Sequence, residues 1–287
     1  MAGGKLFAQA DSVAKAVLLL QNQNMPADVR VKQALEIIDR AIKNPQSAKN
    51  AYAWYVRGYV YKEWYKTFES SNKKSKTRND AVTYLKKALE LDSTKEYSAN
   101  IKQTIKYIGS TFYNDAVSSL DETNYSIAID AYTKYKECML LFDQNYNLKR
   151  SEIEFKTVLA DLYAKIFRND IKTNSQFFGM SEGTYKQVIA LDSNNRSANL
   201  NLALLYYNYG VDIINAMDVS SDIIVIENIQ DQAKELFKKA LPYAIKSYEL
   251  NPKDRRVLIA LQGIYFSLYE FEKSDEFKAK VEQLDKK

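Results

Sequence analysis

The sequence predicts an all-α chain in which antiparallel helix pairs stack on one another. Apolar residues recur at spacings of three and four along nearly the whole chain, and runs of alternating β-branched residues are missing. Only four prolines interrupt this pattern. Three segments also end alike, at residues 88–93 (ALELDS), 188–193 (VIALDS) and 247–252 (SYELNP). Because one helix pair cannot bury its apolar faces alone, this repetition predicts a single stacked domain over residues 1–287.

The first three helix pairs are predicted from their periodic apolar residues and from the polar turns between them. The first pair covers residues 7–23 and 27–43, and it closes at Asn44-Pro45. A polar, lysine-rich turn separates the two helices of the second pair, at residues 47–70 and 79–91. The third pair is expected at residues 97–120 and 125–142.

The last three pairs follow from the same signals. The fourth covers residues 148–168 and 181–191, and the polar turn at 192–195 follows it. The fifth covers residues 196–217 and 228–250. Pro242 falls inside its second helix, so we expect either a kink or a fresh helix start with Pro242 in the first turn. The sixth pair is expected at residues 254–271 and 273–284.

Close approach of two helices is predicted for the second pair. Trp54, Gly58 and Tyr61 lie four and then three residues apart, which places them on one face of their helix. The partner helix repeats this spacing with Ala81, Leu85 and Ala88. The small residues allow the backbones to approach, while the aromatic rings fill the space beside them.

These offsets resemble the tetratricopeptide repeat, a hairpin with Trp, Leu-Gly, Tyr, Ala, Phe, Ala and Pro at fixed positions. The second pair matches at Trp54, Arg57-Gly58, Tyr61, Ala81, Leu85, Ala88 and Ser93. The third matches at Ile108-Gly109, Phe112, Ala128 and Tyr132, and the fifth at Leu202-Ala203, Tyr206, Gly210, Ala240, Ala244 and Pro252. Weaker matches extend the resemblance over nearly the whole chain. It implies a right-handed α-solenoid of about six pairs.

The chain departs from this family in the length of its hairpins. The family places about nine residues between its tyrosine position and the next small position. The intervals here are 20 (Tyr61 to Ala81), 16 (Phe112 to Ala128), 18 (Tyr163 to Ser181), 34 (Tyr206 to Ala240) and nine (Tyr265 to Ser274). The added residues therefore elongate the turns inside the hairpins, which line one edge of a stacked array. We expect them to form overlong first helices and a raised ridge along that edge.

Composition limits the functional classes. Apolar residues make up 46% and charged residues 27% of the 287 residues, which indicates a folded chain. No apolar run approaches the ~18 residues of a membrane span. Histidine is absent, which removes the commonest catalytic base and zinc ligand. The one cysteine, Cys138, allows no intrachain disulfide and is expected to be a buried thiol. The net charge of +5 is a mild bias, consistent with acidic partners but not with a nucleic-acid-binding stripe.

The first ten residues leave the localisation open. Residues 6–10 (LFAQA) look like the small-residue end of a secretory signal, yet no basic start or long apolar segment precedes them. Residues 1–10 are either the remnant of an export signal, which would place the protein in the periplasm, or the frayed start of a helix in a cytoplasmic protein.

No motif predicts a cofactor, a metal ion or a catalytic residue. Gly179 and Gly183 are not followed by the Lys-Ser or Lys-Thr of a phosphate loop, and carboxylates are spread along helix faces opposite lysines. The densest basic cluster is formed by Lys73, Lys74, Lys76 and Arg78. It is either a solvated turn or an electrostatic contact for an acidic protein, a membrane surface or a nucleic acid.

Tyrosine is in excess, with 22 residues. In the family, one side of each first helix faces a concave groove, and tyrosine suits such a surface because it joins a rigid ring to a polar tip. Projecting that side gives the predicted groove residues Tyr52, Tyr55, Tyr59, Lys62, Lys106, Ser110, Tyr113, Asn114, Asp161, Lys165, Asn201, Tyr207 and Asn208. They either bind a partner or pack between helices. Tyr55 and Tyr59 stand where the family's clamp for terminal carboxylates would carry Lys and Asn, so that clamp is not expected.

The residues and the resemblance together predict a noncatalytic scaffold that captures an extended or helical protein segment in this groove. Lys62, Lys106 and Lys165 are expected to favour acidic side chains of the partner, whose identity is not predicted. A single-stranded nucleic-acid binder is the alternative, which the near-balanced charge disfavours. An enzyme is the weakest reading, because no histidine, motif or pocket supports one.

Overall fold

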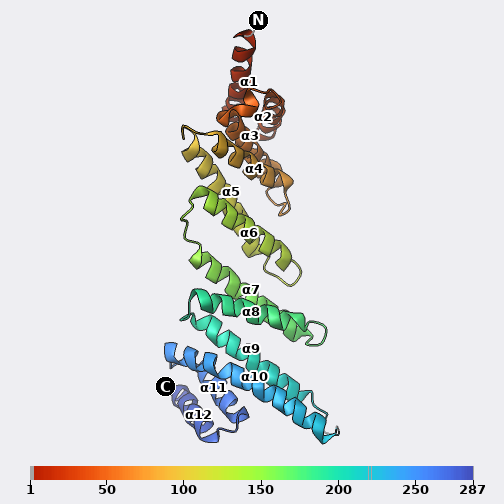
Figure 1. The fold of residues 1–287 in the computed structure, drawn as a ribbon, viewed down its shortest axis with the longest axis vertical. Coiled ribbons are helices and arrows are strands. Elements are labelled where there is room, and N and C mark those ends of the chain that lie inside the picture. The colour runs from red at the N-terminus through yellow and green to blue at the C-terminus, as the bar shows by residue number, and fades with distance from the viewer. Residues whose placement is uncertain (1–2, 219, 221, 287) are drawn as a thin grey trace. The chain divides into compact units, whose positions relative to one another are not determined.

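The computed structural model describes residues 3–218, 220 and 222–286, with side chains from residue 12 onward. Twelve α-helices and two short helical turns, at Ser47–Lys49 and Tyr65–Glu69, are the only regular elements in this part of the chain (Figure 1). The predicted all-α fold class is therefore confirmed. The helices are α1 (Gly3–Gln21), α2 (Ala27–Ala41), α3 (Ala51–Trp64), α4 (Lys76–Leu91), α5 (Ser98–Ser118), α6 (Tyr125–Phe142), α7 (Lys149–Asn169), α8 (Gln176–Leu191), α9 (Arg196–Asn215), α10 (Ile223–Leu250), α11 (Arg255–Ser267) and α12 (Phe271–Asp285).

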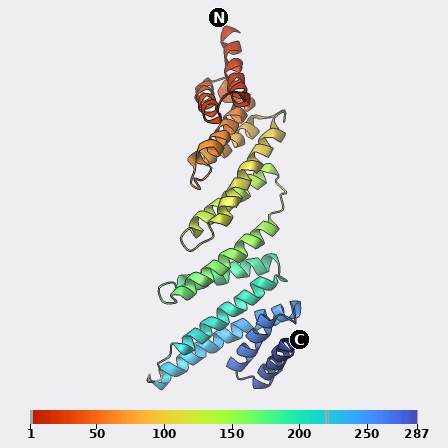
Figure 2. The ribbon, with the colours of Figure 1, turned by 180° about the vertical axis from the view of Figure 1, so that it is seen from behind.

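Consecutive helices pack as antiparallel pairs, from α1–α2 to α11–α12 (Figures 1 and 2). The chain divides into two compact units, Met1–Asn147 and Leu148–Lys287, with three pairs in each. That all six pairs form one continuous domain stays a prediction. Of the first ten residues, 3–10 belong to α1 and 1–2 lie outside the described residues.

The core of the first unit begins where α1, α2 and α3 meet. Ala34, Ile38 and Val60 are completely buried there. The first helices of successive pairs also touch, because α3 contacts both α1 and α5. Asn50 and Ser75 fix the starts of α3 and α4, since each side chain accepts a hydrogen bond from a backbone N–H of the first turn.

The predicted close packing of the second pair is confirmed. A Cβ atom on Gly58 would lie 2.6 Å from Leu85 Cγ and 3.1 Å from the Ala81 carbonyl oxygen, so only glycine fits between α3 and α4. The third pair repeats this arrangement, because a Cβ atom on Gly109 would lie 2.9 Å from Cys138 Cβ. In these two pairs the helices therefore approach each other closely at a glycine, as the resemblance to the tetratricopeptide repeat implies.

The repeated segment ends fix the start of the next hairpin. Asp92 closes the first of them, and its carboxylate accepts hydrogen bonds from the backbone N–H groups of Glu96 and Tyr97 at 3.1 and 3.0 Å. The Ser98 hydroxyl donates to the same carboxylate at 2.7 Å. In the second unit, Asn195 follows the second repeated segment and caps α9.

The second unit is packed in the same way but carries the longest helix. Leu202, Ala203 and Ala240 are completely buried between α9 and α10. Helix α10 runs from Ile223 to Leu250 and continues through Pro242, so the predicted fresh helix start at this proline is wrong. The Pro242 ring lies on an exposed face, where it displaces no packed neighbour.

Three second helices begin earlier than predicted, α4 at Lys76, α8 at Gln176 and α10 at Ile223. Asp222 caps α10 by accepting a hydrogen bond from a first-turn N–H, a signal that the periodicity of the apolar residues did not reveal. The residues added inside the hairpins are thus largely helical, as expected. They lengthen both helices of a pair, whereas the prediction placed the extra length on the first helix.

The turns inside the long hairpins gather along one edge within each unit. In the first unit, Lys73 in the α3–α4 turn donates to the Ser118 carbonyl oxygen at 3.1 Å and to the Ser119 hydroxyl at 2.8 Å, where α5 ends. In the second unit, the end of α7 and the end of α9 lie on the same side (Figure 1). This agrees with the edge predicted from the sequence.

Candidate functional site

A hollow of about 390 Å³ opens in the first unit between α1, α3 and the start of α5. We call it the tyrosine groove. Its lining residues are Val17, Leu20, Gln21, Tyr52, Tyr55, Val56, Tyr59, Tyr97 and Asn100. The structure thus brings together the predicted groove residues Tyr52, Tyr55 and Tyr59. Sequence reasoning missed Tyr97, which immediately precedes α5 and approaches them from another pair.

The tyrosine rings form a continuous strip along the groove. The ring centroids are 5.0 Å apart for Tyr52 and Tyr97, 6.3 Å for Tyr52 and Tyr55, and 6.2 Å for Tyr55 and Tyr59. These separations suit tilted and edge-to-face aromatic pairs. All four rings are half-buried, so each keeps some surface for a partner. The same rings therefore pack against one another and keep part of their surface exposed.

The groove is uncharged. Among the side chains that the structure describes, none of those lining it is acidic or basic. Burial raises the pKa of Tyr55, although a hydrogen bond with Thr104 opposes this shift. Burial, followed by the charge of Glu63, raises the pKa of Tyr59. Both hydroxyls therefore stay protonated at neutral pH and keep a proton to donate.

Lys62 does not serve the groove as expected. Its side chain is buried, its ammonium pairs with Glu63, and its Nζ lies 3.8 Å from the centre of the Tyr59 ring and 5.5 Å from that of Tyr107. The charge is therefore used inside the protein. That Lys62 favours an acidic partner stays a prediction, and its burial between two rings and a carboxylate argues against it.

The predicted residues on α5 lie apart from the tyrosine groove, since none of them lines it. Lys106 places its Nζ 4.7 Å from the centre of the Phe142 ring. Tyr113 packs against Tyr135 with a centroid distance of 4.9 Å, while Ser110 and Asn114 are exposed. The contact of Tyr113 with Tyr135 agrees with the alternative that this tyrosine packs between helices.

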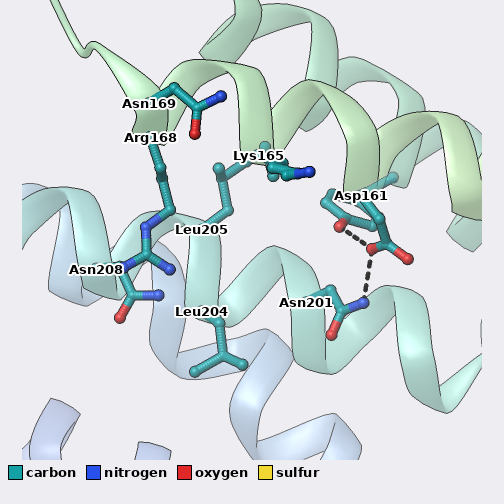
Figure 3. Close-up of a pocket in the computed structure, with 10 residues that line it drawn as sticks. Asp161, Lys165, Arg168, Asn169, Asn201, Leu204, Leu205 and Asn208 are labelled. Atoms are coloured by element: carbon teal, nitrogen blue, oxygen red, sulfur yellow. Dashed lines mark hydrogen bonds between the residues drawn. The ribbon is translucent and has the colours of Figure 1, made fainter. Parts of the chain in front are cut away.

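A second hollow, of about 460 Å³, opens in the second unit between α7, α8 and α9 (Figure 3). We call it the polar pocket. It is lined by Asp161, Ala164, Lys165, Arg168, Asn169, Tyr185, Asn201, Leu204, Leu205 and Asn208. Four predicted groove residues therefore meet here, namely Asp161, Lys165, Asn201 and Asn208. Arg168 and Asn169 were missed, although they lie one turn beyond Asp161 and Lys165 on the same helix face.

Asp161 is held in place by two neutral donors. The Tyr185 hydroxyl and the Asn201 amide both donate to its Oδ1 atom, the amide at 2.8 Å. Burial and the charge of Asp161 raise the pKa of Tyr185 well above its usual value, so the phenol stays a donor. Tyr185 is not among the groove residues predicted from the sequence. Because the hydroxyl of a buried tyrosine needs a hydrogen-bond partner, a tyrosine at a packing position indicates a polar group close to it.

Tyr207 lies outside the polar pocket and is a packing residue. A Cβ atom on Gly263 would collide with the Tyr207 hydroxyl, and the Tyr207 ring lies 5.7 Å from that of Phe237. Helices α9, α10 and α11 therefore meet at this ring. Of the two alternatives that the sequence left open for Tyr207, these contacts favour packing, because Gly263 leaves room for the phenol.

The basic cluster at the α3–α4 turn is divided, since Lys74 and Lys76 are exposed whereas Arg78 is buried. Arg78 is only 1% exposed and pairs with Asp115 at 2.6 Å. Its guanidinium also donates to the Tyr65 hydroxyl at 2.9 Å and lies 4.0 Å from the centre of the Phe112 ring. Together with the bonds of Lys73 to the end of α5, this joins the second pair to the third.

Few groups in the described residues have the properties of a catalytic centre. Burial raises the pKa of the Cys138 thiol to about 12, which disfavours the reactive thiolate. Within residues 12–218, 220 and 222–286, no three His, Cys, Asp or Glu side chains are grouped to hold a metal ion. No helix in the part of the chain that the structure describes is long and apolar enough to span a membrane.

No family model and no curated protein matches the sequence. Solved structures that resemble the fold include human IFIT1 as a dimer with m7Gppp-AAAA, at 11% identity and a TM-score of 0.36, covering 95% of this chain and 50% of that chain. PilF of Pseudomonas aeruginosa matches at 13% identity and a TM-score of 0.32, with 98% and 93% covered. The TPR2AB domain of yeast Sti1 with pHSP90 matches at 14% identity and a TM-score of 0.31, covering 99% of this chain and 92% of that chain. Likenesses this distant concern the helical-repeat fold alone.

Proposed function

We propose that the protein is a noncatalytic scaffold that binds a protein segment in the tyrosine groove. The observation that carries this proposal is the strip of four half-buried tyrosines, Tyr52, Tyr55, Tyr59 and Tyr97, around one uncharged hollow. Tyrosine is enriched at the energetic centres of protein interfaces because its ring is large, stiff and apolar. The groove therefore offers the kind of surface that anchors a partner.

The chemistry of the groove favours a segment with apolar side chains. Val17 and Leu20 of α1 form an apolar wall beside the rings, so apolar atoms of a partner would lose water on both sides. The protonated hydroxyl of Tyr55 can donate to a carbonyl oxygen of the bound chain, whereas the hydroxyl of Tyr59 is already hydrogen-bonded to Glu63. Whether the segment is extended or helical, its side chains would lie against the rings.

The absence of charged side chains in the groove argues against the two alternative functions, nucleic-acid binding and catalysis. Phosphates require cations, whereas Lys62 and Arg78 are buried in internal ion pairs. Acid–base catalysis requires a group that titrates near the working pH, and the lining phenols of Tyr55 and Tyr59 have raised pKa values. A scaffold for protein segments is the function that this chemistry supports best.

A display selection tests the proposal without a known partner. Random peptides are selected on the wild-type protein, and the dissociation constants of the enriched peptides are measured for wild type and for Tyr55→Ala/Tyr59→Ala. We expect at least about tenfold weaker binding by the variant, with unchanged helical circular dichroism, because two anchoring rings are lost.

Tyr269→Ala/Phe271→Ala is the matched control, since both rings are more than half exposed in the second unit and far along the chain from the groove. It should bind the selected peptides as wild type does. Enrichment of no peptide, or equal binding by the groove variant, would reject the proposal.

A further inference from the structure

We infer that the polar pocket of the second unit binds the side-chain carboxylate of an acidic residue in a protein segment. This extends the proposed function to a second site with a different preference. It rests on the residues of α7, α8 and α9 only, so it can fail or succeed independently of the tyrosine groove.

The pocket is built by matching faces of two first helices. Asp161, Lys165 and Arg168 recur at spacings of four and three on α7, as do Asn201, Leu205 and Asn208 on α9. Polar ends therefore extend into one hollow from both sides, as Figure 3 shows. A bound segment would contact two successive hairpins at once.

The negative charge of Asp161 is fixed at one end of the pocket. Its Oδ1 atom accepts hydrogen bonds from both Tyr185 and Asn201. Figure 3 shows these bonds on one side and Arg168 beside Asn208 on the other. A ligand carboxylate at the Arg168 end would therefore be separated from the carboxylate of Asp161.

Arg168 is the group that points to an anion. It makes no hydrogen bond or ion pair within the described residues, although its guanidinium lies at a pocket of about 460 Å³. Leu204 and Leu205 supply apolar walls, which strengthen an ion pair by reducing its exposure to water. The planar guanidinium matches a carboxylate with two parallel hydrogen bonds, and the Asn208 amide lies next to it for a third.

The charge of the lining favours a singly charged ligand. Lys165 and Arg168 carry two positive charges and Asp161 one negative charge, which leaves one positive charge to be balanced. A carboxylate balances it, whereas a doubly charged phosphate would exceed it. The hollow is also much larger than one carboxylate, so the flanking residues of a chain fit around it.

A peptide titration tests this inference. The probe is acetyl-Ala-Ala-Glu-Ala-Ala-amide, and the controls are the same peptide with Gln in place of Glu and free glutarate. The ¹⁵N signals of the Arg168 Nε–H group and of the Asn201 and Asn208 side-chain amides are followed at low and high salt. We expect saturable shifts with the Glu peptide only. The dissociation constant obtained from them should be at least about fivefold higher at high salt.

Arg168→Gln should abolish the shifts of the Asn201 and Asn208 amides. The control is Arg150→Gln, the same change at an exposed arginine of α7, which should not alter these shifts. Thermal unfolding monitored by circular dichroism checks that both variants fold. Equal shifts with the Glu and Gln peptides, no shifts, or shifts kept by Arg168→Gln would overturn the inference. So would glutarate binding as tightly as the peptide, since the site would then take small free carboxylates.

Discussion

The tyrosine groove and the polar pocket occupy comparable places in their units, yet they differ in the charged and aromatic side chains that line them. Each lies between the first helices of neighbouring pairs, α1, α3 and α5 in one case and α7 and α9 in the other. The groove is lined by tyrosines, aliphatic side chains and two amides, whereas the pocket combines amides and leucines with two cations and a carboxylate. The helical hairpin thus provides the place, and the side chains on the first helix decide what is recognised.

The two units also differ in how they use charge. In the first unit, two buried cations make internal ion pairs, Arg78 with Asp115 and Lys62 with Glu63. In the second unit, Arg168 remains at the surface of the polar pocket. The comparison therefore predicts that equivalent substitutions of Arg78 and Arg168 have different consequences.

Replacement of Arg78 should produce the largest loss of stability. Arg78→Ala removes one partner of a buried ion pair and leaves the Asp115 carboxylate uncompensated, which costs about 3–5 kcal/mol. Urea unfolding followed by tryptophan fluorescence measures this directly, because both tryptophans, Trp54 and Trp64, lie in the first unit.

The matched change in the second unit is Arg168→Ala. We expect it to alter the free energy of unfolding by less than about 0.5 kcal/mol, since it removes no packed contact. If the two arginines proved equally costly, or equally dispensable, the contrast between structural and available charge would not hold.

Much of the framework could be predicted from the sequence because it depends on local spacing. The three-and-four pattern placed Tyr52, Tyr55 and Tyr59 on one face, and the close packing at Gly58 followed from the small residues opposite it. What the sequence could not show were contacts made across hairpins. Tyr97 joins the groove from the next pair, so no spacing along one helix could reveal it.

The same limit explains the errors in assigning charge. A lysine or arginine on a helix is usually solvated, and its burial depends on a partner that only the tertiary structure supplies. Arg78 meets Asp115 of the following pair, and Lys62 lies between the rings of Tyr59 and Tyr107. Arg168, by contrast, lies one turn beyond Lys165, the last residue of α7 among the predicted groove residues, so helical spacing alone could have indicated it.

Glycine substitutions sharpen the comparison at an intermediate size of effect. Gly58→Ala in the first unit places a methyl group 2.6 Å from Leu85 Cγ and 3.1 Å from a backbone oxygen, so α3 and α4 must separate. We expect a loss of about 1–3 kcal/mol by urea unfolding. Gly183→Ala in α8 meets nothing within 4 Å and should stabilise the protein by about 0.5–1 kcal/mol. A destabilising Gly183→Ala would contradict this assignment.

An effect confined to alkaline pH concerns the ionisation of the tyrosines in the two sites. Burial and Asp161 raise the pKa of Tyr185, which is 1% exposed, while burial raises that of Tyr55 in the groove. The folded protein therefore holds these protons more tightly than the unfolded chain. Their stabilisation is complete below pH ~10 and is lost as the pH rises above it, at up to about 1.4 kcal/mol per pH unit for each tyrosine.

Tyr185→Phe should therefore flatten the fall of unfolding free energy between about pH 10 and 12, even though loss of the bond to Asp161 lowers stability by about 1 kcal/mol at neutral pH. Tyr55→Phe should flatten the curve less, because no carboxylate adds to the effect of burial on Tyr55. Urea unfolding followed by circular dichroism at each pH measures both variants against wild type. An unchanged alkaline slope in Tyr185→Phe would mean that the phenol in the polar pocket is not held by Asp161, and the anchoring of that carboxylate would have to be sought in Asn201 alone.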